Sequence, residues 1–146
     1  MPKAHRIPRW GRREEGFTLL ELLIVLSILG LLATLVGPQL IGYLGRAKAD
    51  TARLGIEQLR TSLDLFRLDV GRYPLQSEGL AALVERPGSA PNWRGPYLEK
   101  REAIVDPWGK PFVYVIPGKH KTYDLYSLGA DNTPGGEGEN ADLTNW

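Results

Sequence analysis

Residues 16–37 read GFTLLELLIVLSILGLLATLVG, and this stretch decides how the chain is organised. From Phe17 to Gly37 the run has 21 residues, and its only ionisable side chain is Glu21. At 1.5 Å per residue such a run forms a helix of about 31 Å, close to the thickness of the hydrocarbon core of a bilayer. The stretch therefore predicts a helix that spans a membrane once.

Two alternatives, a buried helix of a soluble protein and a cleaved secretory signal peptide, share this apolar pattern. A basic segment precedes the run, as in a signal peptide, but Glu21 interrupts it and no A-x-A cleavage pattern follows in LLATLVGPQL. The helical pattern also resumes directly after Pro38, so a retained anchor is favoured. Residues 1–13 hold five basic and no acidic side chains, which keeps the N-terminus cytoplasmic and places the rest outside.

Residues 38–71 continue as an amphipathic helix, because apolar residues recur there at alternating spacings of four and three. Gly71 and Pro74 are expected to end this helix. Glycines cluster around Pro38, and both residue types weaken a helix, so this junction is expected either to kink or to unwind. The apolar stripe consists of Ala52, Ile56, Leu59, Leu63, Phe66 and Val70.

The region after the long helix is rich in turn residues. A short helix is expected in QSEGLAALVERP (76–87), with Ser77 as its N-cap, and DPWGKP (106–111) has the composition of a type I turn. Two strand-like runs, 112–116 and 122–128, flank PGKHK and are expected to pair as an antiparallel hairpin. A long helix packed on a small antiparallel sheet is an α+β arrangement.

The composition excludes several kinds of chemistry. The chain has no cysteine, which excludes disulfides, thiolate metal sites and a thiol nucleophile. His120 is expected to be solvated in a turn, and no catalytic set or phosphate loop is recognisable, so an enzyme is not expected. The net charge of +1 gives no argument for nucleic acid, and Trp93, Trp108 and Trp146 are expected to pack in the core rather than to stack on bases.

The last 25 residues carry five acidic side chains and no basic one. In residues 127–146, SLGADNTPGGEGENADLTNW, acidic side chains supply hard oxygen ligands and glycines let backbone carbonyls turn inward. Calcium accepts such a mixture of ligands, although the pattern is not that of an EF-hand. From the residues alone, a calcium loop and a disordered acidic loop are equally consistent. The acidic residues of the stretch 127–146 are Asp131, Glu137, Glu139 and Asp142.

The stretch GFTLLELLIVLSILGLLATLVGPQL resembles the leader junction of the type IV pilins and pseudopilins. The resemblance implies that residues 1–16 are a leader, that a prepilin peptidase cuts after Gly16, and that the new N-terminal residue, Phe17, is N-methylated. It also implies that Glu21 pairs with the Phe17 amine of a neighbouring subunit during filament assembly. An intramembrane carboxylate is a candidate functional residue, but Glu21 could instead extend to the membrane surface.

The segments DPWG, YSLGAD, GGEG and ADLTNW are together similar to the major pseudopilins of type II secretion, the general secretion pathway protein G family. The resemblance implies a pilin-like α+β fold with a transmembrane part at 17–37, an amphipathic part at 38–71 and a C-terminal α+β region with a calcium loop at 72–146. It also implies one structural calcium ion. Its ligands would be the side chains of Asp131 and Asp142 and the carbonyls of Leu128 and Thr133.

The same resemblance implies a major structural subunit that crosses the inner membrane once, with its C-terminal region in the periplasm. Such subunits form a helical homopolymer that drives folded proteins across the outer membrane. The implied partners are further copies of the chain, minor pseudopilins, the inner-membrane assembly platform and the prepilin peptidase. The alternative is a pilin-like surface fibre for adhesion, motility or DNA uptake. Those subunits commonly close their C-terminal region with a disulfide, so the absence of cysteine favours secretion.

Overall fold

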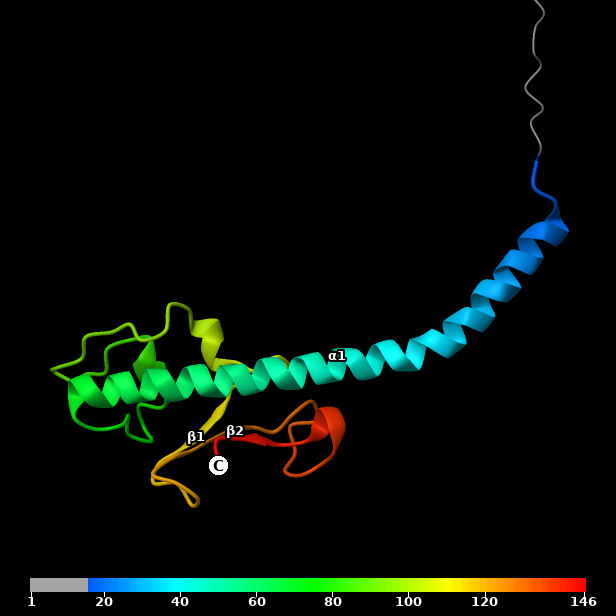
Figure 1. Cartoon of the computed structure of the whole chain (residues 1–146). Coiled ribbons are helices and arrows are strands. Elements are labelled where there is room, and N and C mark those ends of the chain that lie inside the picture. The colour runs from blue at the N-terminus through cyan, green and yellow to red at the C-terminus, as the bar shows by residue number, and fades with distance from the viewer. Residues whose placement is uncertain (1–15) are drawn as a thin grey trace, which may run out of the picture. The chain divides into compact units, whose positions relative to one another are not determined.

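The computed structural model describes residues 16–146, so residues 1–15 of the predicted leader lie outside the described part (Figure 1). The chain separates into two units, Met1–Gln39 and Leu40–Trp146. The first element, helix α1 (Leu19–Val70), contributes residues to both units. Pro38 lies inside α1, so the predicted weak junction is helical here, and its capacity to kink or unwind stays a prediction.

The first part of α1 is an apolar helix that the rest of the chain does not cover. Within residues 16–146, α1 is the one helix long and apolar enough to cross a membrane, and the apolar part is unburied. Leu19, Leu31 and Leu35, for example, are 80%, 68% and 68% exposed. A contiguous apolar surface of this kind is stable in a bilayer or against other apolar helices, and not in water.

The second part of α1 carries the core of the C-terminal unit. Leu59, Leu63 and Phe66 have no exposed surface and Ile56 is 2% exposed, which confirms the predicted apolar stripe. Burial of each of these large side chains contributes about 1.5–3 kcal/mol. Their partners come from the loops and from the sheet that lies beside α1 in Figure 1: Leu80, Leu83, Leu98, Phe112, Tyr114, Leu125 and Leu143.

A glycine ends α1, as predicted. Gly71 has φ of 86°, in the left-handed region that glycine adopts without strain, and its amide donates to the Arg67 carbonyl at 2.8 Å. The next element differs from the prediction, because η1 (Leu80–Leu83) is a 3₁₀ helix that follows Gly79 and has no side-chain cap. The positive φ of Gly79, 58°, starts this element two residues beyond Ser77, so the predicted cap is wrong.

Three short strands form an antiparallel sheet in the order β1-β2-β3: β1 (Val113–Val115), β2 (Asp124–Ser127) and β3 (Leu143–Thr144). Strands β1 and β2 are the predicted hairpin, with Tyr114 opposite Leu125. The sequence does not predict β3, which has only two residues and pairs Leu143 with Ser127. Through β3, the end of the acidic segment becomes part of the sheet.

The DPWG segment forms the predicted turn and is tied to the sheet. The Gly109 amide donates to the Asp106 carbonyl at 2.9 Å and closes the turn. The buried Asp106 carboxylate accepts the amides of Trp108 and Lys110 at 3.0 and 2.8 Å, and the Ser127 hydroxyl of β2 at 2.6 Å. A short 3₁₀ helix, η2 (Arg101–Ile104), leads into this turn.

Two of the three predicted core tryptophans pack as expected. Trp93 and Trp108 are partly buried against the core, and the Trp93 indole donates to the Ala82 carbonyl at 2.8 Å. Trp146 is different: it is 45% exposed and stacks on the His120 ring with a centroid distance of 4.1 Å. The core prediction for Trp146 is therefore wrong, because the hairpin turn provides an aromatic partner at the surface.

Candidate functional site

The start of α1 places the predicted processing and assembly residues next to one another. Gly16, Phe17 and Thr18 precede the helix in non-helical backbone, and Phe17 is 84% exposed. The Thr18 hydroxyl accepts the Glu21 amide at 3.2 Å, and the Thr18 carbonyl accepts the Leu22 amide at 3.1 Å. Thr18 is thus the N-cap of α1, with Glu21 at the third helical position.

This cap fits a role for the junction in both processing and assembly. The bond between Gly16 and Phe17 lies in exposed, non-helical backbone, which a peptidase can reach. Glu21 is exposed in the first turn of α1, where the helix dipole stabilises a carboxylate. Thr18 is not among the residues predicted from the sequence, although the Thr-x-x-Glu signature of a capping box is visible there. The pairing of Glu21 with another subunit stays a prediction.

The acidic segment folds into a loop in which the two predicted carboxylate ligands contact the same turn. Asp131 Oδ1 accepts the Thr133 amide at 3.1 Å, and Asp142 Oδ2 accepts the Gly135 amide at 2.9 Å. The structure therefore brings Asp131 and Asp142 to amides only two residues apart. The other oxygen of Asp142, Oδ1, is buried and has no hydrogen-bond partner among the described residues. A buried carboxylate oxygen without a partner is costly unless a cation or donor satisfies it.

The backbone of the loop supports the same interpretation. Asn132, Gly135 and Gly136 all have positive φ, at 56°, 96° and 88°, so the chain between the two aspartates turns back on itself. Leu128 and Asp142, two of the predicted ligand residues, line the same surface hollow. Calcium suits such carboxylate and carbonyl oxygens on a flexible loop, and the residues present fit that ion.

Acidic side chains alone do not enclose an ion in the described part of the chain. Residues 16–146 contain no group of three or more His, Cys, Asp or Glu side chains that could hold a metal. The predicted site uses two carboxylates and backbone carbonyls, so this finding does not decide it.

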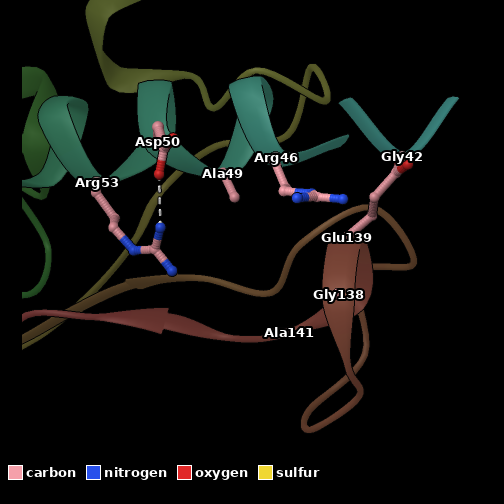
Figure 2. Close-up of a pocket in the computed structure, with 8 residues that line it drawn as sticks. All are labelled: Gly42, Arg46, Ala49, Asp50, Arg53, Gly138, Glu139 and Ala141. Carbon is pink, nitrogen blue, oxygen red and sulfur yellow. Dashed lines mark hydrogen bonds and ion pairs between the residues drawn. The ribbon is translucent and has the colours of Figure 1, made fainter. Parts of the chain in front are cut away.

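The remaining acids of the loop behave differently from the two aspartates. Glu137 is exposed. Glu139, in the 3₁₀ helix η3 (Gly138–Asn140), is half-buried, and its side chain rises toward α1 near Gly42 and Arg46 (Figure 2). The sequence shows no signal for this contact, because Glu139 and the helix are about ninety residues apart in the chain.

His120 is exposed in the β1–β2 turn, as predicted, but its ring also contacts two neighbouring side chains. Its Nδ1 lies 3.1 Å from Asp124 Oδ2, and its ring lies nearly parallel to Trp146, at 8°. Burial raises the pKa of Asp124, but hydrogen bonds from the Lys119, His120 and Lys121 amides and from the His120 ring outweigh it and lower that pKa overall. These contacts fasten the C-terminus to the β1–β2 turn.

Comparison with known proteins identifies the family of the chain. The family model described as type II secretion system (T2SS), protein G, matches residues 39–146, and the prokaryotic N-terminal methylation motif matches residues 11–37. The type II secretion system core protein G of Pseudomonas aeruginosa is 44% identical over 139 residues, which cover 92% of this chain and 96% of that protein. The protein of the same name from Vibrio cholerae is 42% identical over 138 residues, covering 92% and 93%.

A solved structure shares the fold as well. The major pseudopilin from the type 2 secretion system of enterohaemorrhagic Escherichia coli is 34% identical, with a TM-score of 0.60 and coverage of 75% of this chain and 95% of that chain. A methylation motif on a long apolar helix, joined to a small antiparallel sheet, defines a pilin-like α+β protein. More narrowly, this chain belongs to the type II secretion system protein G family, which confirms the family resemblance stated from the sequence.

Family membership separates the two functional predictions. The matched relatives are secretion-system proteins, so the comparisons support the secretion subunit and not the surface fibre. The family is structural rather than enzymatic. The apolar first part of α1 and the family together indicate a membrane-anchored protein that assembles with other secretion components.

Proposed function

We propose that the chain polymerises into a periplasmic pseudopilus that drives folded proteins across the outer membrane, and that it carries out no catalysis. The observation that carries this proposal is the uncovered apolar part of α1, joined to a folded unit with the protein G pattern. In a membrane the lipid tails cover this apolar helix, and in a filament the helices of other copies cover it. Each state buries the leucines that a single chain in water leaves exposed.

The proposed topology follows from the charge distribution. The basic leader stays in the cytoplasm and the C-terminal unit lies in the periplasm. A prepilin peptidase removes residues 1–16 and N-methylates Phe17, and the processed subunits then meet the inner-membrane assembly platform and the minor pseudopilins. The methylation motif over residues 11–37 supports processing at this junction.

Deleting the gene tests the proposed function directly. We expect exoproteins to accumulate in the periplasm, while twitching motility and transformation continue, and we expect the wild-type gene to restore release. Normal secretion combined with lost motility would refute the proposal in favour of a surface fibre.

We propose further that Glu21 pairs with the methylated amine of Phe17 in a neighbouring subunit. Two separate charges at membrane depth are costly, and pairing removes most of that cost while setting the subunit register. The Glu21→Ala variant is expected to be cleaved normally but to form no filaments. The Thr18→Ala variant is the control, because it removes the cap of α1 and keeps the carboxylate. Filaments from processed Glu21→Ala subunits would contradict the pairing.

We propose that the acidic loop binds one structural calcium ion. Asp131 and Asp142 would hold it with their side chains, and Leu128 and Thr133 with their carbonyls. When bound, the ion would supply a positive charge, and the proposal is supported by the buried Asp142 Oδ1, which has no hydrogen-bond partner among the described residues.

Thermal melting of the protein in detergent, with calcium and then with EGTA, tests this site. Because only the folded loop binds the ion, calcium at one hundred times its Kd adds about 2.7 kcal/mol of stability, a rise in Tm on the order of 10 °C. The Asp142→Asn variant is expected to lose this shift, whereas Glu137→Gln, at an exposed position, keeps it. An unchanged Tm in wild-type protein would rule out the calcium site.

A further inference from the structure

The acidic loop touches α1 at a glycine. Gly45 lies on α1 and is buried, although its neighbours Leu44 and Arg46 are exposed. A Cβ atom built on Gly45 would collide with Cγ, Cδ and Oε1 of Glu139. The glycine therefore leaves a notch on the helix, and the Glu139 side chain lies in it. Glu139 is also one of the residues that line the groove in Figure 2.

The contact is one of shape rather than of charge. Arg46 is close by, but its guanidinium lies over the Tyr43 ring, 5.3 Å from the centroid. No ion pair to Glu139 is present in residues 16–146. The aliphatic part and the carboxylate of Glu139 pack directly against the bare backbone of the helix.

Glu139 also contacts the backbone at the start of the acidic loop, at Gly129 and Ala130. Its carbonyl accepts the Ala130 amide at 2.9 Å, and the same carbonyl lies 2.7 Å from where a Cβ of Gly129 would be. Ala130 precedes Asp131 directly, and Asp142 follows Glu139 by three residues. Glu139 thus joins the helix, through its side chain, to the backbone directly before Asp131, one of the proposed calcium ligands.

We propose that Glu139 is a positioning residue for the acidic loop, seated in the notch at Gly45, so that α1 and the bound ion hold each other in place. This inference rests on the proposed calcium site. Its consequence for the helix follows from linkage: if the seated loop binds calcium better, calcium must in turn stabilise the seated state. This part of α1 is intrinsically weak because it contains Pro38, Gly42 and Gly45. Contact with the acidic loop therefore stabilises the helix here.

The glycines of α1 provide a matched pair of variants. In Gly42→Ala the new methyl group has only Arg46 Nη2 nearby, at 4.0 Å, whereas in Gly45→Ala it collides with Glu139. Both changes bring the same gain in helix propensity. We expect Gly42→Ala to raise the Tm of the full chain in detergent by about 4 °C and to leave the calcium Kd unchanged. We expect Gly45→Ala to weaken calcium binding about tenfold, as measured by calorimetry.

A double variant distinguishes loss of the Glu139–Gly45 contact from a general destabilisation of the loop. Shortening the side chain removes the collision, so the Gly45→Ala/Glu139→Ala double variant is expected to bind calcium about as well as Glu139→Ala alone. The isosteric Glu139→Gln variant is expected to keep the wild-type affinity. Additive losses in the double variant would overturn the proposal. A large loss in Glu139→Gln would also overturn it, because Glu139 would then be a ligand and not a positioning residue.

Hydrogen exchange gives a second readout. Calcium is expected to slow exchange of the α1 amides around Gly45 in wild type and in Gly42→Ala, but not in Gly45→Ala. Equal protection in both glycine variants would refute the coupling. If wild-type protein binds no calcium, the calcium proposal and the coupling both fail. The contact between Glu139 and Gly45 is then tested by melting the two glycine variants without calcium. A Tm of Gly45→Ala that is no lower than the Tm of Gly42→Ala would refute the contact.

Discussion

The ion pair between Arg72 and Glu78 links the end of α1 to the loop that follows, and it predicts a specific dependence of stability on pH. The guanidinium contacts both carboxylate oxygens, at 2.7 and 2.9 Å, and the Leu75 amide donates to Oε2 at 2.7 Å. The Ser89 hydroxyl donates to the other oxygen. The hydrogen bonds from Arg72, followed by those from Ser89 and Leu75, outweigh burial and lower the pKa of Glu78 from 4.5 to about 2.

The size and the sign of the effect follow from linkage. A fall in pKa from 4.5 to about 2 corresponds to about 3 kcal/mol of folding free energy at neutral pH. Because the folded pKa lies below the unfolded one, this stability is complete above pH 4.5 and is lost as the pH falls toward 2. At pH 3 roughly 1 kcal/mol remains. The side chain of Glu78 is only 8% exposed and that of Arg72 is 32% exposed, so solvent screens the carboxylate little and the guanidinium in part.

Comparing wild type with Glu78→Gln at pH 7 and pH 3 measures this contribution. Other carboxylates titrate in both proteins, so the difference between the two free energies of unfolding isolates Glu78. We expect that difference to shrink by about 2 kcal/mol between pH 7 and pH 3, with denaturation of the full chain in detergent as the assay. Glu85→Gln is the control: its pair with Arg101 spans 3.6 Å and Glu85 is 66% exposed, so its effect should be near zero at both values. A Glu78→Gln difference that does not change with pH would refute the reasoning.

Two further substitutions test the core and the end of α1. Leu63→Ala removes a side chain with no exposed surface and should lower the free energy of unfolding by about 2–5 kcal/mol in the same assay, whereas Leu68→Ala, at a position 80% exposed, should change it by less than about 0.5 kcal/mol. Gly71→Ala forces a side chain into a backbone with φ of 86° and should cost about 1–2 kcal/mol; a gain in stability would mean that the glycine is not needed to end the helix.

Periodicity explains why most of the fold is predictable from the sequence. The apolar stripe of α1 has a period that only a helix satisfies, and five of its six members are buried in the core, while Val70 is partly buried against it. Gly71 and the DPWG turn were predictable for a similar reason, because each depends on backbone geometry that few residue types adopt. The hairpin follows from two β-rich runs separated by turn residues.

Features that depend on distant partners were not predictable in this way. Strand β3 is too short to have a period of its own and exists because β2 offers it an edge. Trp146 stacks on His120 rather than entering the core, because the β1–β2 turn lies beside the C-terminus in space. The seat of Glu139 on Gly45 joins two segments that share no local pattern. Such contacts come from the tertiary arrangement and leave no trace in residue spacing.

Glu21 and Asp142 raise the same physical question at opposite ends of the chain. Glu21 is a carboxylate within an apolar helix, and Asp142 has one carboxylate oxygen buried without a partner among the described residues. Glu21 is costly within a bilayer, and the buried oxygen of Asp142 is costly within the folded loop, so we propose that a positive charge that arrives after synthesis satisfies each of them. We infer that these charges differ in source: processing creates an amine for Glu21, and the periplasm supplies a calcium ion for Asp142. On this proposal neither positive charge is present in the newly made chain, because both arrive only once the chain has been processed and has reached the periplasm.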